Sequence, residues 1–259
     1  GARIYNTGAL TWRPGVTIQG MGKDVTVIRG NAAVNVLSLL VTTPGSPDSI
    51  SGVIRDLSID CNNVGLRGLH LRDTNRFYIH RVGVYNCTTR GILHEGGEVV
   101  VYDKMEIRNN NVGIEGLASP TAPLAPPNYV TMRDMVVTSN VTRGIDWLAG
   151  RSLNILDSDF EANGTTGNAA TGSINIAGMA STAPGQTVVM RNSWSERCGG
   201  HSCLRISGPS NARNVALIDG SFFDAGGTAT YGVHLSGADA RLVMNDSTLV
   251  NAISFDVST

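Results

Sequence analysis

The sequence is poor in charge, in aromatic side chains and in long apolar runs. Charged residues make up 16% of the chain and aromatic residues 5%, and 20 basic residues balance 21 acidic ones to a net charge of −1. Without a basic tail or face, nothing in the composition favours a nucleic-acid partner. The longest apolar run, VNVLSLLV (34–41), is much shorter than the roughly 18 residues of a membrane span, so membrane insertion is not expected.

Cysteine is also scarce, with four residues in 259. Four are too few for a disulfide scaffold of this size. Cys61 and Cys87 are interpreted as core or turn residues, and Cys198 and Cys203 flank GGHS closely enough to close a small loop. The preferred prediction is four free thiols, which leaves the cellular compartment open.

The chain is rich in glycine, with 31 residues, and in small and β-branched side chains. These residue types suit short strands and tight turns better than helices. No segment shows a 3.6-residue apolar period long enough for a helix between strands. The composition therefore predicts an all-β protein.

One short pattern recurs through the chain, with apolar residues favoured at the first, fourth and sixth places of a six-residue core. Eight copies are IRDLSI (54–59), IHRVGV (79–84), YDKMEI (102–107), MRDMVV (132–137), ILDSDF (155–160), MRNSWS (190–195), LIDGSF (217–222) and VMNDST (243–248). The basic period is 23 to 26 residues. Insertions at 117–127, 164–172 and 179–186 account for the two longest steps. A fixed period of roughly 20 to 50 residues is typical of solenoids.

Each copy predicts three strands and three turns. Two polar residues, such as Arg133 and Asp134, make a bend, and the next three residues alternate in, out and in. Asparagine follows at a corner, because it tolerates a positive φ angle. The third strand opens with glycine and an aliphatic residue. These openings are Gly68-Leu69, Gly91-Ile92, Gly113-Ile114, Gly144-Ile145 and Gly232-Val233.

A single coil of this kind cannot bury its own apolar face, but stacked coils can. We therefore predict one domain over residues 1–259, a single-stranded right-handed parallel β-helix with three short strands per rung and roughly nine to ten rungs. Residues 1–30 form the opening rung and 31–258 the stacked rungs. A β-propeller is the alternative, but it needs about 40 residues per repeat. The inward positions are Leu57, Val82, Met105 and Met135, and then Ile59, Val84, Ile107, Val137 and Phe160.

The opening stretch WRPGVTIQGMGKDVTVIRG (12–30) resembles the first rung of pectate-lyase-superfamily proteins, and bacteriophage tailspikes and polysaccharide depolymerases in particular. The degenerate repeat extends this resemblance to about residue 258. The resemblance implies a parallel homotrimer on a virion surface or outside the cell, in contact with other virion proteins. Because the chain begins GARIYNTGAL without an initiator methionine, we expect a fragment of a longer chain.

Stacking turns equivalent positions of successive repeats into columns of neighbouring side chains. The outward column of the central strand reads Ser58, Gly83, Glu106, Val136, Asp159, Trp194 and Ser221, and two residues later Asp60, Tyr85, Arg108, Thr138, Glu161 and Glu196. Glu161 and Glu196 are then about 5 Å apart, and Asp159 and Glu161 about 7 Å, which brackets the carboxylate separations of glycosidases. Trp194 and Tyr85 offer flat faces to sugar rings, Arg108 suits a sugar carboxylate, and Glu106 lies two rungs from Asp159. The alternative is a solvated face of mixed charge.

A second column on the third strand reads His70, Leu93, Glu115, Asp146, Asn175, Arg205 and His234. Here Glu115 and Asp146 are stacked, and like charges at that distance keep one carboxylic acid protonated. Arg205 is a substrate-binding candidate on the same column. The insertion at 117–127 begins two residues after Glu115, and insertions in solenoids gather on the binding face. An ordinary surface or subunit contact is the alternative.

These observations lead to three hypotheses about function. The first is a tailspike-like protein that binds, and in its catalytic form hydrolyses, a bacterial surface polysaccharide. Glu115 or Glu161 would protonate the glycosidic oxygen, and Asp146, Asp159 or Glu196 would activate water or attack. The second is a non-catalytic adhesive or structural virion spike, and the third a secreted polysaccharide lyase. No cofactor is expected, and HEGGE (94–98) matches no metal-binding spacing.

Overall fold

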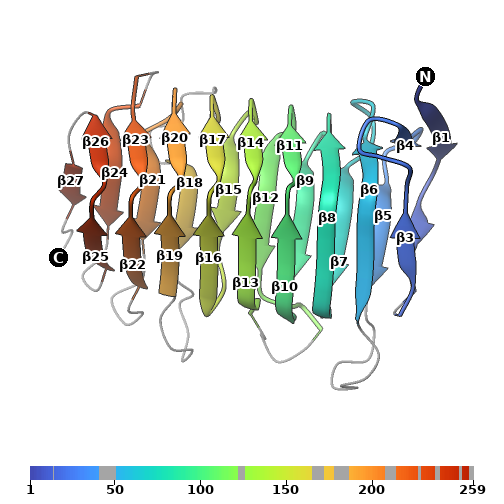
Figure 1. Cartoon of the computed structure of the whole chain (residues 1–259), viewed down its shortest axis with the longest axis horizontal. Helices are drawn as coiled ribbons and strands as arrows, with labels where there is room; N and C mark the ends of the chain where they lie inside the picture. The colour runs from blue at the N-terminus through green and yellow to red at the C-terminus, as the bar shows by residue number, and fades with distance from the viewer. Residues whose placement is uncertain are drawn as a thin grey trace.

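The computed structural model contains β-strands and turns, and it confirms the predicted right-handed parallel β-helix. It describes residues 1–13, 15–40, 51–121, 126–164, 172–177, 187–207, 214–226, 229–236, 240–250 and 253–256. Most of the insertion at 164–172, the whole of 179–186 and residues 122–125 of the insertion at 117–127 lie outside these ranges. The coils stack along one axis, with the N-terminus at one end and the C-terminus at the other (Figure 1).

The front face has a lower and an upper half that belong to one sheet. β6 (Gly52–Asp60) and β8 (Asn75–Tyr85) run through both halves as single bent strands. The lower half also contains β3 (Thr17–Gln19), β10 (Glu98–Asp103), β13 (Asn128–Arg133), β16 (Ser152–Leu156), β19 (Thr187–Arg191), β22 (Asn214–Asp219) and β25 (Ala240–Asn245). The upper half also contains β1 (Arg3–Thr7), β4 (Thr26–Gly30), β11 (Glu106–Arg108), β14 (Val136–Thr138), β17 (Asp159–Glu161), β20 (Trp194–Glu196), β23 (Phe222–Asp224) and β26 (Thr248–Val250).

The back face is a separate sheet of ten strands, one from each coil, in agreement with the predicted rung number. The strands are β2 (Leu10–Thr11), β5 (Asn35–Leu40), β7 (Arg67–Arg72), β9 (Arg90–Glu95), β12 (Val112–Leu117), β15 (Arg143–Trp147), β18 (Gly172–Ala177), β21 (Ser202–Ser207), β24 (Tyr231–Ser236) and β27 (Ile253–Asp256). The described residues include no helix long and apolar enough to cross a membrane.

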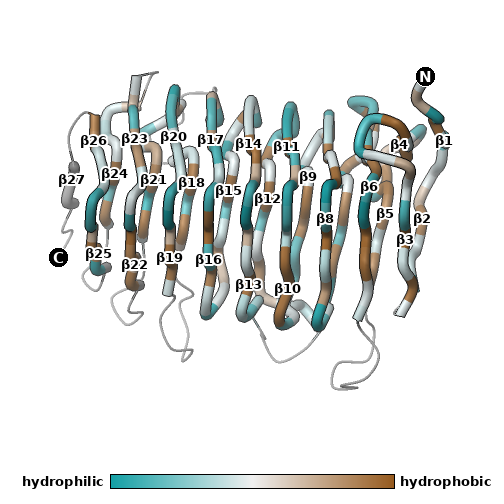
Figure 2. The backbone as a smooth tube through the Cα atoms, viewed as in Figure 1, coloured by the Kyte–Doolittle hydropathy of each residue, from teal (hydrophilic) through white to brown (hydrophobic). Residues whose placement is uncertain are grey.

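The core lies between the two faces and is made of the predicted aliphatic columns. All nine predicted inward residues, from Leu57 to Phe160, are at most 1% exposed. Apolar stretches recur from coil to coil along the stack (Figure 2). Trp147 also points into the core and is fully buried. The core is thus a continuous strip, and each coil buries its apolar side chains against the coils on either side.

The last two copies of the repeat begin one residue later than predicted. Met190 pairs with Ile218, and Ile218 pairs with Met244, so the true copies are 218–223 and 244–249. Leu217 and Val243, which stand one place earlier, are about 40% and 47% exposed. The shift also removes Ser221 from the outward column, where Phe222 takes its place opposite Trp194.

Ser221 belongs instead to a column of serines at the bend between the two halves of the front face. Ser158 N donates to Ser193 Oγ at 3.3 Å, Ser193 N to Ser221 Oγ at 3.2 Å, and Ser221 N to Ser247 Oγ at 3.2 Å. The residue before each serine has a positive φ, as at Asp157, Asn192 and Gly220. Asp219 therefore lies one place before the bend, unlike the acids Asp56, Asp134 and Asp157 in their copies of the repeat. The other three have φ between 50° and 59° and do form it.

Asparagine has two separate roles at the corner that follows the upper strands. Asn62, Asn86 and Asn109 have positive φ angles, as predicted. In contrast, Asn110, Asn140 and Asn163 point inward and are fully buried. Their amides form a ladder, in which Asn110 Nδ2 donates to Asn140 Oδ1 at 3.0 Å and Asn140 Nδ2 to Asn163 Oδ1 at 2.8 Å. The corner thus satisfies its buried polar groups through side chains of neighbouring coils.

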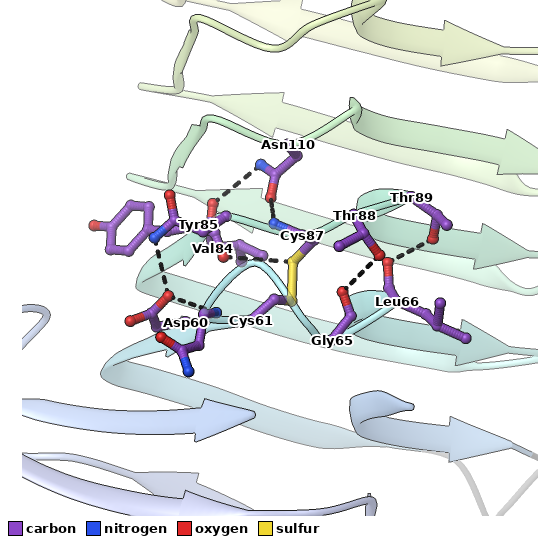
Figure 3. The surroundings of a disulfide bond; sticks show 12 residues. Asp60, Cys61, Gly65, Leu66, Val84, Tyr85, Cys87, Thr88, Thr89 and Asn110 are labelled. Carbon is purple, nitrogen blue, oxygen red and sulfur yellow. Dashed lines mark hydrogen bonds between the residues drawn. A yellow bond between two sulfur atoms is a disulfide. The ribbon is translucent and has the colours of Figure 1, made fainter. Parts of the chain in front are cut away.

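The four cysteines form two disulfides, so the prediction of free thiols is wrong. Cys61 and Cys87 are 26 residues apart, about one repeat, and this brings them into neighbouring coils. Cys87 occupies the ladder position one coil before Asn110, whose Oδ1 accepts a hydrogen bond from Cys87 N at 3.0 Å (Figure 3). Cys198, bonded to Cys203, occupies the position one coil after Asn163. A disulfide therefore flanks the ladder on each side.

We expect Asn140→Ala to destabilise the fold by about 3 kcal/mol, because it leaves buried partners in both neighbouring coils without a hydrogen bond. Asn109→Gly is the matched control at an exposed position of positive φ, and it should cost less than about 1 kcal/mol. Urea unfolding followed by circular dichroism gives both values. Equal losses in the two variants would show that the ladder adds nothing to stability.

The two disulfides should contribute unequally, because they close loops of different length. The Cys61–Cys87 bond joins residues 26 apart and the Cys198–Cys203 bond residues 5 apart. In the chain-entropy model, removal of the first costs about 3.5 kcal/mol and of the second about 2 kcal/mol. Unfolding of the two double-alanine variants in oxidising buffer measures this difference. The reverse order would contradict an effect that acts through the unfolded chain.

Candidate functional site

The outward columns of the upper front face have the predicted register, except at Ser221. Glu106 pairs with Val136, Val136 with Asp159, and Asp159 with Trp194. Glu161 and Glu196 are direct neighbours on β17 and β20. Three predicted catalytic carboxylates therefore lie on two adjacent strands of one exposed face.

Within this acidic cluster, Asp159 differs from the other two carboxylates. Burial and the nearby charges of Glu161 and Glu196 raise the pKa of Asp159. Glu161 accepts a hydrogen bond from Arg197 at 2.8 Å, and Glu196 accepts one from Trp194 Nε1 at 2.8 Å. Asp159 thus has the environment of a proton donor. Its two neighbours each accept a hydrogen bond instead, from Arg197 and from Trp194.

An aromatic pair lies beside the acidic cluster. Trp194 and Phe222 stack with their ring centroids 4.1 Å apart and their planes at 25°. Trp194 is 46% exposed, although a large aromatic side chain is normally buried. Phe222 was missed in the sequence because the last two copies of the repeat were aligned one residue early. Because the two rings are stacked on each other, each leaves one face that the other ring does not cover, and Trp194 lies between Phe222 and Asp159 in the column.

A second group of predicted residues lies toward the N-terminal end of the same face. Tyr85 covers Gly83, where a methyl group would clash with the tyrosine ring. The Glu106 carboxylate forms ion pairs with Lys23 and, at 3.2 Å, with Arg108. It also accepts a hydrogen bond from Tyr85 Oη at 3.3 Å. The Arg108 guanidinium also lies 4.7 Å from the centre of the Tyr85 ring. Arg108, predicted to bind a sugar carboxylate, is thus engaged by Glu106 and Tyr85.

Two cations, Lys23 and Arg108, surround the single carboxylate of this group. Burial raises the pKa of Tyr85, and the charge of Glu106 adds to this effect. For Glu106 itself, burial acts to raise the pKa, but Lys23, Arg108 and Tyr85 outweigh it and lower the pKa. A lowered pKa keeps Glu106 ionised, which suits a structural anion better than a proton donor.

The predicted column on the back face has the expected register throughout. Glu115 and Asp146 are stacked neighbours, and each is about 5% exposed. Arg90 binds the Glu115 carboxylate through two nitrogens, and Arg143 binds Asp146. Because a guanidinium neutralises each acid, the two carboxylates do not form an isolated like-charge pair.

The remaining back-face residues continue the same polar network. Asn175 Nδ2 donates to Asp146 Oδ1 at 2.7 Å, and Arg205 lies between Asn175 and Ser236. Burial lowers the pKa of Arg205. At the other end of the row, burial acts to raise the pKa of Glu95, but His70 and Arg72 outweigh it and hold the pKa at about 2. The back face thus carries ion pairs from β7 to β15, whereas Arg205 on β21 is held by the neutral side chains of Asn175 and Ser236.

One cluster on the lower front face was missed in the sequence. Asp103, 3% exposed, accepts hydrogen bonds from Tyr78, from His80 Nδ1 at 2.7 Å and from Arg133 at 2.9 and 3.2 Å. His80, Asp103 and Arg133 hold the same place in three consecutive copies of the repeat, and this was the available signal. Burial acts to raise the pKa of Asp103, but these three partners outweigh it and hold the pKa at about 2.

The structure therefore divides the predicted site residues into three groups. Asp159, Glu161, Glu196 and Trp194 form one cluster, and Tyr85, Glu106 and Arg108 form another two coils away on the same face. Glu115, Asp146 and Arg205 lie on the opposite face. Among the residues described, no three histidine, cysteine or acidic side chains converge as metal ligands.

Comparison with solved structures supports the fold. The chain matches ORF18 of Geobacillus virus E2 with a TM-score of 0.64 and 16% identity, over 98% of this chain and 52% of the viral one. It matches the polygalacturonase from Erwinia carotovora ssp. carotovora with a TM-score of 0.60 and 12% identity, over 98% and 87% of the two chains. Tailspike protein 3 of bacteriophage CBA120 gives a TM-score of 0.56 and 14% identity, over 100% and 54%.

These likenesses concern the pectate-lyase-like right-handed β-helix, which phage tailspikes and carbohydrate-active enzymes share. The chain spans about half the length of the viral and tailspike structures that it matches. No family model and no curated protein matches the sequence.

The Asp103 cluster gives a stability test that depends on pH. A carboxylate with a lowered pKa stabilises the fold above its unfolded pKa near 4, and this stability is lost as the pH falls to about 2. We expect Asp103→Asn to cost on the order of 2 kcal/mol at pH 6 and progressively less toward pH 2. Asp134→Asn, an exposed carboxylate one coil away, is the control. Midpoints of urea unfolding between pH 2 and pH 6 measure the stability of both variants. A destabilisation by Asp103→Asn that does not vary with pH would contradict the lowered pKa of Asp103.

Proposed function

We propose that this chain binds a bacterial surface polysaccharide across the upper front face and hydrolyses it with the acidic cluster. One observation carries the proposal: the exposed Trp194, stacked on the half-buried Phe222, lies directly beside three carboxylates, one of which has a raised pKa. Aromatic faces stack on the apolar face of a sugar ring, and a carboxylic acid of raised pKa can protonate a glycosidic oxygen.

In this proposal Asp159 is the general acid. Glu161 lies two residues further along the same strand, at about 7 Å, and Glu196 lies diagonally on the next strand, at about 8 Å. Side chains carried at this backbone spacing can reach the separation of about 6.5–9.5 Å between carboxyl groups that inverting glycosidases use, in which the second carboxylate activates a water molecule. Glu196 is the better base, because the Trp194 indole orients it, whereas Arg197 neutralises Glu161.

The wider assignment follows the likeness to tailspikes. A location on a virion surface is supported by the names of two matched structures, a viral protein and a phage tailspike. A homotrimer in contact with other virion proteins is a further part of the proposal. Two disulfides favour an extracellular location, because such bonds persist in oxidising environments.

A non-catalytic adhesive spike is the second candidate. One observation favours it: the acidic cluster lies on a sheet face, and a cavity at the N-terminal end of this face is lined by other residues. In this case Trp194 and Phe222 would still bind sugar, and the acids would serve affinity alone.

Release of reducing ends from purified capsule, lipopolysaccharide and polygalacturonate tests the proposal. We expect Asp159→Asn to lower kcat at least 100-fold, because general acid catalysis contributes about that much. Trp194→Ala should mainly raise KM. Glu115→Gln tests the competing back-face hypothesis and should retain turnover. Loss of turnover in Glu115→Gln but not in Asp159→Asn would place the chemistry on the other face. Retained binding without hydrolysis of any polymer would favour the adhesive spike.

A further inference from the structure

A cavity of about 500 Å³ lies at the N-terminal end of the front face, outside the acidic cluster. The connection between β3 and β4 forms one wall, and the bend between the lower and upper halves forms the other. Gly20 N and Gly22 N donate to the backbone oxygens of Arg55 and Asp56 at 3.0 and 2.9 Å, which fixes this connection over the bend. The cavity is therefore built by backbone contacts.

Three cations and one anion line this cavity. The cations are Lys23, Arg81 and Lys104, and the anion is Asp56. Arg81 pairs with Asp56, and Lys23 pairs with Glu106. Within the part of the chain that the structure describes, Lys104 forms no ion pair. Arginine has five N–H donors and lysine three, so the paired cations keep donors for a ligand.

The two bend cations have a backbone conformation that favours short polar residues. Arg81 and Lys104 have φ angles of 50° and 54°, in the left-handed region. Elsewhere in this column the bend is made by aspartate, asparagine or glycine, the residues that adopt this conformation at least cost. Two adjacent coils thus place long cationic side chains where a short polar residue is favoured. Because other long side chains such as Arg76 and Tyr129 have the same φ outside the cavity, the feature that distinguishes Arg81 and Lys104 is the positive charge that they add to the cavity.

From this geometry we propose that the cavity binds an anionic group of a glycan, such as a uronate carboxylate or a phosphate substituent. The assignment to a glycan rests on the proposed function, whereas anion binding itself rests on the cavity alone. Lys104 lies two coils from the strand that carries Asp159, about 10 Å along the stack. An oligosaccharide bound along the front face would thus place an acidic sugar unit in the cavity, while its other sugar units reach the Trp194–Phe222 pair.

Isothermal titration calorimetry with tri-galacturonate tests the proposal, with its methyl ester as a neutral ligand of the same shape. We expect the wild type to bind the acid at least tenfold more tightly than the ester. The Arg81→Asn, Lys104→Asn double variant should bind the acid at least tenfold more weakly than the wild type does, and its affinity for the ester should be unchanged. Its melting temperature should be equal or higher, because asparagine tolerates the left-handed conformation. Arg76→Asn is the matched control, since Arg76 has a φ of 54° on β8 and does not line the cavity.

The outcomes separate this proposal from the preceding one. Equal binding of acid and ester, or unchanged binding in the double variant, would overturn the anion site. Inorganic phosphate and sulfate at matched ionic strength form the third arm: binding as tight as that of tri-galacturonate would overturn the assignment to a glycan. Asp159→Asn should bind tri-galacturonate like the wild type, so a failure of hydrolysis leaves this result intact.

Discussion

Parallel hydrogen bonding that keeps each coil in register with the next determines every surface of this protein. β6 and β8 show it most fully, with eight residue pairs in which the partners are 25 residues apart. A slip of one residue would turn the outward side chains into the core and the core into solvent. Serines at the bend and asparagines at the corner form hydrogen bonds between neighbouring coils. They therefore fix the register at two points of the cross-section.

The periodic part of the sequence was sufficient to predict the columns. The repeat predicted that Glu161 and Glu196 are neighbours, because aligning the six-residue cores gives the two residues the same place in their copies, despite the insertions between them. It failed at the last two copies for a physical reason. In LIDGSF and VMNDST two consecutive apolar residues precede the bend, so either can be placed inward by hydropathy alone. The position of Gly220, with its positive φ, decides the register and could have been used.

The chemistry of the columns was harder to predict, because it depends on which neighbour a flexible side chain reaches. Glu115 is stacked on Asp146 as expected, yet Arg90 reaches Glu115 from the coil before it. Such diagonal pairs do not follow from the repeat length. The disulfide between Cys61 and Cys87 is different, since a separation of one period already places both residues at the same corner of adjacent coils. The small number of cysteines led to the prediction of free thiols, whereas the spacing of Cys61 and Cys87 indicates a disulfide between neighbouring coils.

The front face has an uneven charge distribution along the stack. Toward the N-terminal end, carboxylates are outnumbered by cations in the cavity, and Glu106 is neutralised by its neighbours. Two coils further on lie Asp159, Glu161 and Glu196, of which Glu161 alone forms an ion pair with the described residues, through Arg197. Both arrangements cost stability, one through left-handed backbone at long side chains and the other through repulsion between carboxylates. A scaffold held by inter-coil hydrogen bonds and a continuous core tolerates such costs on its surface. The same polarity would orient an acidic polymer, with its anionic group drawn to the cations and its uncharged ring faces to the aromatic pair.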